Sequence, residues 1–285
     1  MNTGYLYALL AFGLWGLTPI YFKYLSHTPP VEMVANRVLW SVILLLILIT
    51  GMAKWYRVRL LISQPKHLFT LLLTTVLIAT NWLVFIWAIN DGRMLETSLG
   101  YYINPLITVF LGYIFLQEKH SRVKWFAVFL AAIGVALQLF IVGYLPWVSL
   151  VLAFSFGFYG LLHKRTPTDS LTSLFLETSL LLPFAMGYLL WLSYQGEGPA
   201  TRGTSDWLFL ILAGPITTAP LLFFSGAAKR LPLSVIGFFQ YLSPSMLFVL
   251  AIFVYGEPFD PYKLITFIFI WIALAIFSWD SLRRR

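Results

Sequence analysis

The sequence predicts an all-helical integral membrane protein whose ten transmembrane helices form two inverted five-helix repeats. Of the 285 residues, 60% are hydrophobic and 11% are charged, whereas soluble domains carry about 25% charged residues. The apolar residues form runs long enough to cross a bilayer, and most basic residues lie in the short turns between them. The two halves of the chain also share a weak pattern of matching residues.

Composition argues against several other classes. With 25 Phe, 15 Tyr and 11 Trp among long aliphatic runs, too few polar side chains remain to cover a soluble core, so lipid must be the solvent. Disordered, collagen-like and coiled-coil classes fail on the same composition. The absence of cysteine excludes a disulfide scaffold. The net charge of +8 is not interleaved with a polar aromatic surface, so we expect no nucleic-acid partner.

A transmembrane helix needs roughly 20 predominantly apolar residues. By this criterion the predicted spans cover residues 4–25, 32–52, 68–89, 95–116, 124–142, 146–163, 171–192, 207–228, 234–255 and 262–279. The first span lacks a basic leader and a cleavage site, so it is expected to be retained. The connections 52–67 and 193–206 are the longest and the richest in turn and polar residues, and no soluble domain fits between the spans.

The basic residues predict the orientation. If the helices alternate, one side receives Lys54, Arg57, Arg59, Lys66, Lys119, Arg122, Lys124, Lys164, Arg165, Lys229, Arg230, Arg283, Arg284 and Arg285. The other side receives Lys23, Arg93, Arg202 and Lys263. Cytoplasmic loops carry the excess of Lys and Arg, so both termini are expected to be cytoplasmic.

The repeat is visible in the register of a few residues. A shift of 139 positions aligns Tyr102 with Tyr241, Asn104-Pro105 with Ser243-Pro244, Glu118 with Glu257 and Lys124 with Lys263. Shifts of 145 and 144 align Glu32 with Glu177 and Trp15-Gly16 with Tyr159-Gly160. Residues 1–142 and 146–285 would each hold five spans. Because five is an odd number, the second copy would enter the membrane from the opposite side and would be inverted. Many secondary transporters use inverted repeats for alternating access.

In the second span, Arg37 has two open interpretations. Its side chain could snorkel to the membrane interface, or it could be a fixed cation that attracts an anionic group of a substrate. In the third span, Asn81 lies beside Trp82 and is better explained as an interhelical hydrogen-bond donor or a cavity donor than as a catalyst.

The fourth and ninth spans have matching polar residues and prolines. Tyr101, Asn104 and Thr108 share one helical face, and Gln240 and Ser243 occupy the equivalent places in the ninth span. Proline cannot donate to the carbonyl four residues earlier, so Pro105 and Pro244 would each free one carbonyl. A packing kink would explain a single proline, but the symmetric pair favours broken helices around a midplane site.

The fifth and seventh spans add two further features. The fifth has small residues at Ala127, Ala131, Ala132 and Ala136, which would permit close packing within the bundle or in a dimer, and we favour the bundle. Glu177 of the seventh span is a candidate proton carrier, because burial raises the pKa of a carboxyl group. It could equally bond a neighbouring helix as a neutral acid, and that alternative has somewhat more weight.

Aromatic residues near prolines or small residues complete the candidate pathway. The predicted lining comprises Trp15, Arg37, Asn81, Tyr101, Tyr102, Asn104, Pro105, Tyr159, Phe238, Gln240, Tyr241, Ser243 and Pro244. The sequence has no phosphate-binding loop, dinucleotide fingerprint or H-E-x-x-H pair. Its histidines, His27, His67, His120 and His163, lie far apart in or near loops. We therefore expect no enzyme activity, cofactor or metal site.

Several stretches resemble a known family. NWLVFIWAIN (81–90), ETSLGYYINPL (96–106), GYIFLQEK (112–119), LAFSFGFYGLLHK (152–164) and GFFQYLSPSMLFVLAIFVYGE (237–257) are similar to RarD-type permeases of the EamA branch of the drug/metabolite transporter superfamily. The resemblance covers essentially the whole chain. It implies a bacterial inner-membrane exporter of small metabolites or drugs, with its site between the two halves.

The leading hypothesis is a secondary transporter of a small amphipathic or aromatic solute that works by rocking of the two halves in the lipid bilayer. Protons are the expected coupling ion if coupling exists. The alternatives are a passive facilitator and, from other classes, an intramembrane enzyme or a membrane partner of another complex. The oligomeric state stays open.

Overall fold

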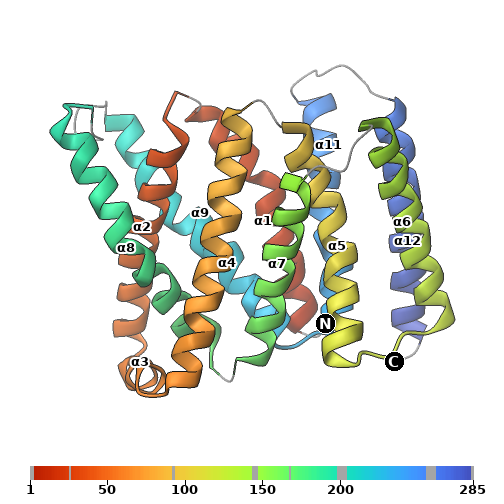
Figure 1. The fold of residues 1–285 in the computed structure, drawn as a ribbon, viewed down its shortest axis with the longest axis horizontal. Helices are drawn as coiled ribbons and strands as arrows, with labels where there is room; N and C mark the ends of the chain where they lie inside the picture. The colour runs from red at the N-terminus through yellow and green to blue at the C-terminus, as the bar shows by residue number, and fades with distance from the viewer. Residues whose placement is uncertain are drawn as a thin grey trace.

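The computed structural model describes residues 3–25, 27–91, 94–142, 147–166, 168–197, 204–254 and 261–283. Within these ranges all regular secondary structure is helical (Figure 1). The helices are α1 (Thr3–Tyr24), α2 (Pro30–Gly51), α3 (Trp55–Ile62), α4 (Pro65–Asn90), α5 (Met94–Leu116), α6 (Arg122–Val142), α7 (Trp147–Arg165), α8 (Ser170–Tyr194), α9 (Thr204–Ala228), α10 (Leu233–Gln240), α11 (Leu242–Phe253) and α12 (Pro261–Arg283).

The predicted all-helical membrane fold is confirmed. Nine of the ten predicted spans each coincide with one helix, and the ninth coincides with α10 and α11 together. In the described ranges, six stretches are long and apolar enough to cross a membrane: Pro30–Gly51, Pro65–Phe85, Trp147–Arg165, Ser170–Tyr194, Asp206–Ala228 and Leu233–Leu250. Shorter apolar helices cover Thr3–Thr18, Gly100–Leu116 and Leu264–Asp280.

Hydropathy did not predict helix α3, which lies in the connection expected to contain turns. It has only eight residues, too few to cross a bilayer. Val58 and Leu61 are three residues apart, lie on one face of the helix and are buried, while charged and aromatic residues surround them. Helix α3 packs against α4 and α8, so this short amphipathic helix lies at one end of the bundle.

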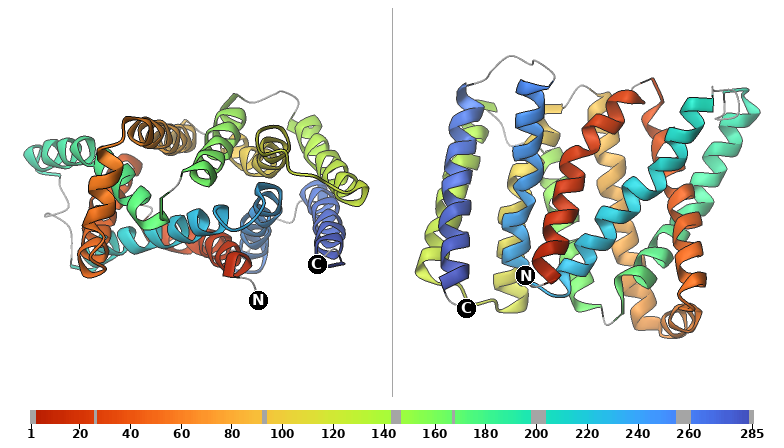
Figure 2. Two further views of the ribbon diagram at one scale, coloured as in Figure 1. Left: turned by 90° about the horizontal axis from the view of Figure 1, so that it is seen from below. Right: turned by 180° about the vertical axis from the view of Figure 1, so that it is seen from behind.

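The helices pack in pairs across the two halves of the chain. Helices α2 and α8 form one edge of the molecule and α6 and α12 the other, as Figures 1 and 2 show. Between these edges, α5 packs on α7 and α10, α1 packs on α9 and α11, and α4 packs on α7 and α8. The largest fully buried side chains of this interior include Tyr159, Phe224, Tyr241 and Phe267.

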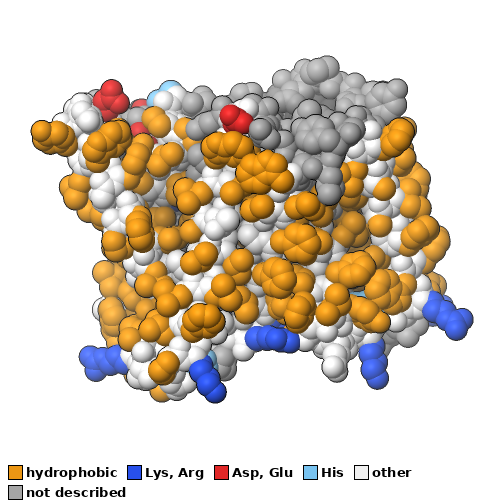
Figure 3. Space-filling view, viewed as in Figure 1, with side chains coloured by type: hydrophobic (Ala, Val, Ile, Leu, Met, Phe, Trp, Pro, Cys, Tyr) orange, Lys and Arg blue, Asp and Glu red, His pale blue; other side chains and the backbone are white. Residues whose placement is uncertain are grey.

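The outer surface is apolar across most of the bundle and charged at its two ends. Figure 3 shows hydrophobic side chains over the middle of one face, Lys and Arg side chains along the lower edge, and acidic side chains near the upper edge. Phe69, Phe140 and Phe184 are among the exposed aromatic residues, at 68%, 87% and 78% exposure. Such a surface is stable in lipid and not in water. The protein is therefore a multi-pass membrane protein.

The start of α1 and the end of α12 lie at the end of the bundle where Lys and Arg gather, which we call the basic end. Of the four basic residues expected at the opposite end, Arg93 and Arg202 lie outside the described residues. The side chains of Lys23 and Lys263 also lie outside the described part of the chain, as does Glu257 of the repeat alignment.

The two prolines of the repeat have different effects on their helices. Helix α5 continues through Pro105, whereas the ninth span is divided into α10 and α11 at Tyr241, three residues before Pro244. The expectation of two broken helices is therefore wrong for α5. Helix α5 remains one helix although Pro105 cannot donate the hydrogen bond to the carbonyl four residues earlier, and α8 likewise continues through Pro183.

Candidate functional site

The polar residues of the fourth and ninth spans meet where α5 crosses α10. The Thr108 hydroxyl lies 3.3 Å from Asn104 Oδ1 and 3.2 Å from Gln240 Oε1. A Cβ atom added to Gly237 would lie 2.8 Å from the carbonyl oxygen of Pro105. Because the backbones approach so closely, these side chains lie in a packed interface between the two helices.

The neighbouring candidates of the ninth span also join helices. The Tyr241 hydroxyl donates to the Tyr102 carbonyl at 3.3 Å, and both side chains are buried. Ser243 Oγ donates to the Phe12 carbonyl of α1 at 2.7 Å. The ring of Phe238 stacks on Phe277 of α12 with centroids 3.7 Å apart. Pro244, which follows Ser243, is buried.

Trp15 and Tyr159 meet in an aromatic group at the centre of the bundle. The Trp15 ring lies 5.6 Å from Phe156 and 5.8 Å from Phe224 between centroids. Tyr159 stacks on Phe224 at 6.0 Å. These contacts bring α1, α7 and α9 together, so the two residues aligned by the repeat both contact one buried phenylalanine, Phe224.

The Arg37 side chain turns into the protein. Its Nε donates to Thr217 Oγ1 of α9 at 2.8 Å, and its guanidinium lies 5.1 Å from the centroid of the Trp82 ring. Of the two interpretations of Arg37, this geometry disfavours snorkelling to the interface. The Tyr101 side chain is 46% exposed and contacts Phe85 edge to face.

Asn81 connects helices α4 and α7. Its Nδ2 donates to the Leu152 carbonyl at 3.0 Å and to Ser155 Oγ at 2.9 Å. Both amide protons thus have partners on one neighbouring helix, as the interhelical interpretation of this residue expects.

Glu177 is the centre of a buried polar network. Its side chain is 1% exposed. Thr74 Oγ1 lies 2.5 Å from Glu177 Oε1, and the Tyr159 hydroxyl donates to Oε2 at 3.2 Å. His163 Nε2 lies 2.9 Å from Oε1, and His163 Nδ1 lies 2.8 Å from Ser225 Oγ. The carboxyl group therefore joins α8 to α4 and α7, and His163 extends the network to α9.

Sequence reasoning identified Glu177 but missed two of its partners, His163 and Thr74. His163 is in the last turn of α7, at the end of the predicted span 146–163 and near a loop, yet its side chain is also 1% exposed. One signal was available, because Tyr159 and His163 are four residues apart and share a helical face. Thr74 gave no signal, since hydroxyl groups in membrane helices often bond their own backbone.

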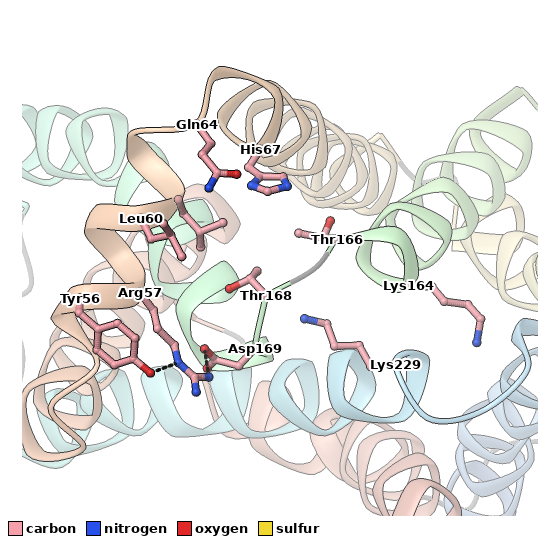
Figure 4. A pocket seen from close by; sticks show the side chains of 11 residues that line it. Tyr56, Arg57, Leu60, Gln64, His67, Lys164, Thr166, Thr168, Asp169 and Lys229 are labelled. Atoms are coloured by element: carbon pink, nitrogen blue, oxygen red, sulfur yellow. Dashed lines mark hydrogen bonds and ion pairs between the residues drawn. The ribbon is translucent and has the colours of Figure 1, made fainter.

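A hollow of about 570 Å³ opens at the basic end, between α3, α7 and the helix ends near Asp169 and Lys229 (Figure 4). This volume is within the usual range for a small-molecule site, roughly 300–1,000 Å³. The hollow is lined by Tyr56, Arg57, Leu60, Leu61, Gln64, His67, Lys164, Thr166, Thr168, Asp169 and Lys229. None of these residues is in the pathway predicted from sequence.

Asp169 holds one wall of the hollow together. Its carboxylate accepts from Lys54 Nζ at 3.0 Å and from Arg57 at 2.9 Å, and it caps α8 through Thr172. Burial alone would raise the pKa of Asp169, but hydrogen bonds from Arg57, Thr172 and Lys54 outweigh it and hold the pKa well below its usual range. Asp169 is therefore a charged anchor between α3 and α8.

Lys229 lies on the opposite wall, just after α9. Burial lowers the pKa of Lys229 to about 8, although the charges of Asp169 and Glu177 partly oppose the shift. Within the described ranges, no three His, Cys, Asp or Glu side chains gather to hold a metal ion.

Comparison with known proteins agrees with the membrane fold. The pattern of the EamA-like transporter family matches residues 2–140 and again residues 145–279. An "Uncharacterized transporter" of Vibrio cholerae is 50% identical over 98% of this chain and 93% of that protein. "Protein RarD" of Escherichia coli is 45% identical over 98% of this chain and 95% of that protein.

Two further similarities are more distant. A "Chloramphenicol-sensitive protein RarD" of Pseudomonas aeruginosa is 33% identical over 98% of this chain and 95% of that protein. A crystal structure of a protein with 18% identity superposes with a TM-score of 0.73 over 100% of this chain and 99% of that chain, which supports the fold. The chain belongs to the EamA-like transporter family as a RarD-type permease.

Proposed function

We propose that this protein is a secondary transporter that exports a small metabolite or drug across the bacterial inner membrane by alternating access. Glu177 is the proposed proton carrier. The observation that carries the proposal is the buried network of Glu177, Thr74, Tyr159 and His163. An ionisable group inside a membrane protein is expensive to bury and commonly marks an ion or substrate pathway.

The chemistry of the network fits a proton carrier. An ionised carboxylate only accepts hydrogen bonds, whereas a protonated carboxyl group also donates one. A proton on Glu177 would therefore change its bonding with Thr74 of α4, in the first half, and with Tyr159 and His163 of α7, in the second. This gives a physical route from proton binding to the relative position of the two halves.

The packing of the helices supports two repeats, residues 1–142 and 146–285. In the order of the spans, α1, α2, α4 and α5 of the first repeat correspond to α7, α8, α9 and the α10–α11 pair of the second. Helix α5 packs on α7, and the corresponding helices α11 and α1 also pack together. Likewise, α2 packs on α9, and the corresponding helices α8 and α4 pack together. The two successive matches to the family pattern have nearly the same boundaries. Both observations favour two copies of one unit, and an inverted pair of such units could rock about its shared interface.

The distribution of charge supports the proposed orientation. Lys and Arg side chains gather at the end of the bundle where α1 begins and α12 ends. By the positive-inside rule, this end faces the cytoplasm. The hollow beside Asp169 and Lys229 would then open toward the cytoplasm and receive cargo for export.

Transport in liposomes tests the proposal. Purified protein is reconstituted with a pH-sensitive dye inside, and a panel of metabolites and drugs is offered with and without a pH gradient. We expect uphill accumulation of at least one compound with the wild type and its loss with Glu177→Gln. Glu197→Gln is the matched control, because Glu197 is exposed after the same helix, and it should transport normally.

Two results would contradict parts of the proposal. Unchanged uphill accumulation with Glu177→Gln would remove this residue from the coupling role. Movement that never exceeds equilibrium, in the wild type and in both variants, would identify a passive facilitator instead.

A further inference from the structure

One cation in the wall of the hollow, Lys229, has no hydrogen-bond partner within the described part of the chain. The Nζ atom of Lys229 is buried and has no hydrogen-bond partner among the described residues. Figure 4 shows its side chain at the hollow, opposite the pair formed by Arg57 and Asp169. A lysine that merely obeyed the positive-inside rule would keep its ammonium group in water, so this position calls for a different explanation.

The other basic groups of the lining are already bonded. Lys164 Nζ donates to the carbonyl oxygen of Ala228, the last residue of α9, and to that of Leu231, which follows α9. Arg57 donates to Asp169 and to Tyr56. Among the Lys and Arg residues of this lining, Lys229 is therefore the one whose cationic group has no hydrogen-bond acceptor among the described residues.

The surroundings of Lys229 suit a small anion. A buried ammonium group is costly unless an opposite charge or hydrogen-bond acceptors reach it. The hollow is large enough for a small molecule, and Gln64, His67 and Thr168 present further polar groups around it (Figure 4). A carboxylate or phosphate group placed here would give Lys229 the acceptor that the described residues do not provide.

We propose that Lys229 binds the carboxylate or phosphate group of a small soluble solute that enters this hollow. The inference rests on the proposed function, because it makes the hollow the entry site of that transporter and its cargo an organic anion. Lys229 is also attracted by the charges of Asp169 and Glu177.

Binding to the purified full-length protein tests the inference without transport. Isothermal titration calorimetry in a neutral detergent would use benzoate, inorganic phosphate and, as a cationic probe, tetraethylammonium. We expect saturable binding of at least one anion and none of tetraethylammonium. Lys229→Gln should weaken anion binding by about tenfold or more, whereas Lys229→Arg should keep it within about threefold.

The matched control is Lys66→Gln, because Lys66 is exposed at the same end and does not line the hollow. It should bind the anion as the wild type does. Equal anion binding by Lys229→Gln and the wild type, or no anion binding by the wild type, would overturn the inference. Circular dichroism and gel filtration would confirm that each variant is folded.

Lipid headgroups carry the same phosphate chemistry and need a separate arm. Nanodiscs of phosphatidylglycerol would be compared with nanodiscs of phosphatidylcholine. Equal benzoate affinity in both would support a soluble solute. The inference would be overturned in favour of a lipid by two results together. Benzoate would no longer bind in phosphatidylglycerol nanodiscs, and phosphatidylglycerol would stay bound to the wild type but not to Lys229→Gln.

The failure of this inference can be told apart from the failure of the proposed function. If the wild type transports, Glu177→Gln abolishes uphill accumulation, and anion binding does not depend on Lys229, the inference alone is overturned. Anion binding that depends on Lys229, in a protein that moves no compound across liposomes, would overturn the transporter proposal and leave an anion-binding membrane protein.

Discussion

The carboxylate of Asp169 combines three structural roles in one side chain. It accepts hydrogen bonds from Lys54 and Arg57 and caps the first turn of α8 through Thr172. Because these contacts hold the pKa of Asp169 below its usual range, the carboxylate stabilises the folded state while it is ionised. This contribution is complete above about pH 4 and is lost as the pH falls toward the lower pKa of the folded state.

Substitution of Asp169 should separate the cap from the charge. Asp169→Asn keeps a capping oxygen but loses the ion pairs, which should cost about 1 kcal/mol at neutral pH because the pairs are partly exposed. Asp169→Ala also loses the cap and should cost about 1 kcal/mol more. Thermal unfolding in detergent would measure both.

The pH dependence provides the control for this prediction. The difference between the wild type and Asp169→Asn should shrink as the pH falls below about 4. A difference that stays constant from pH 7 to pH 3 would show that the charge of Asp169 contributes nothing to stability.

At the level of single residues, the sequence could predict a buried carboxyl group but not its partners. Glu177 is an acid inside an apolar run, and that alone makes it a candidate. Its contact with His163 depends on how α7 and α8 face each other, and Lys229 reaches the hollow only through the way α9 ends. Both features come from tertiary packing, which hydropathy does not encode.

At the level of the helices, the contact between α5 and α10 contains several residues of the predicted pathway. It depends on Gly237, because a Cβ atom there would lie 2.8 Å from the Pro105 carbonyl and 3.0 Å from Val109 Cγ2. One of these neighbours is backbone and cannot move aside easily. The glycine therefore sets the distance between the two helices.

We expect Gly237→Ala to destabilise the protein. Overpacking costs about 1–3 kcal/mol, and the higher helix propensity of alanine offsets at most about 1 kcal/mol. Gly187→Ala is the matched control, because a Cβ atom at this position in α8 would meet nothing within 4 Å. Thermal unfolding should show a lower midpoint for Gly237→Ala and an equal or higher one for Gly187→Ala, and the opposite order would contradict the close approach.

The elements also show where hydropathy succeeds and where it fails. Long apolar runs placed every span, since only a run of this length can cross a bilayer. Helix α3 was missed because its amphipathic pattern is shorter than any membrane helix. The division at Tyr241 and the continuity of α5 were not separable from sequence, because both helices carry the same proline signal.

For the whole molecule, the absence of cysteine permits a direct test of orientation. Lys66→Cys and Glu197→Cys place single thiols at the two ends of the bundle. In intact cells, a membrane-impermeant maleimide should label the cysteine at 197 and not the one at 66, because the basic end is expected to face the cytoplasm. Labelling of both from outside would contradict the alternation of the helices, and labelling of 66 alone would reverse the orientation.

The global fold was more predictable than the site. The lipid around the chain constrains its composition, the length of its spans and the position of its basic residues. These features can therefore be recognised from the sequence alone. The candidate lining from the matching spans lies at helix crossings such as Asn104 with Gln240, and its role in a pathway stays a prediction. The hollow at the basic end had no sequence signal, since helix ends from distant parts of the chain form it.

The anchor at Asp169 has a mechanical consequence. Lys54 and Arg57 belong to the first half of the chain and Asp169 to the second. Their ion pairs therefore link the two halves at the basic end of the bundle. If the two halves rock apart at this end, as the proposed mechanism requires, these ion pairs must break first. Dissolved salt screens partly exposed charges, so the ionic strength of the surrounding fluid would set how readily the protein changes shape.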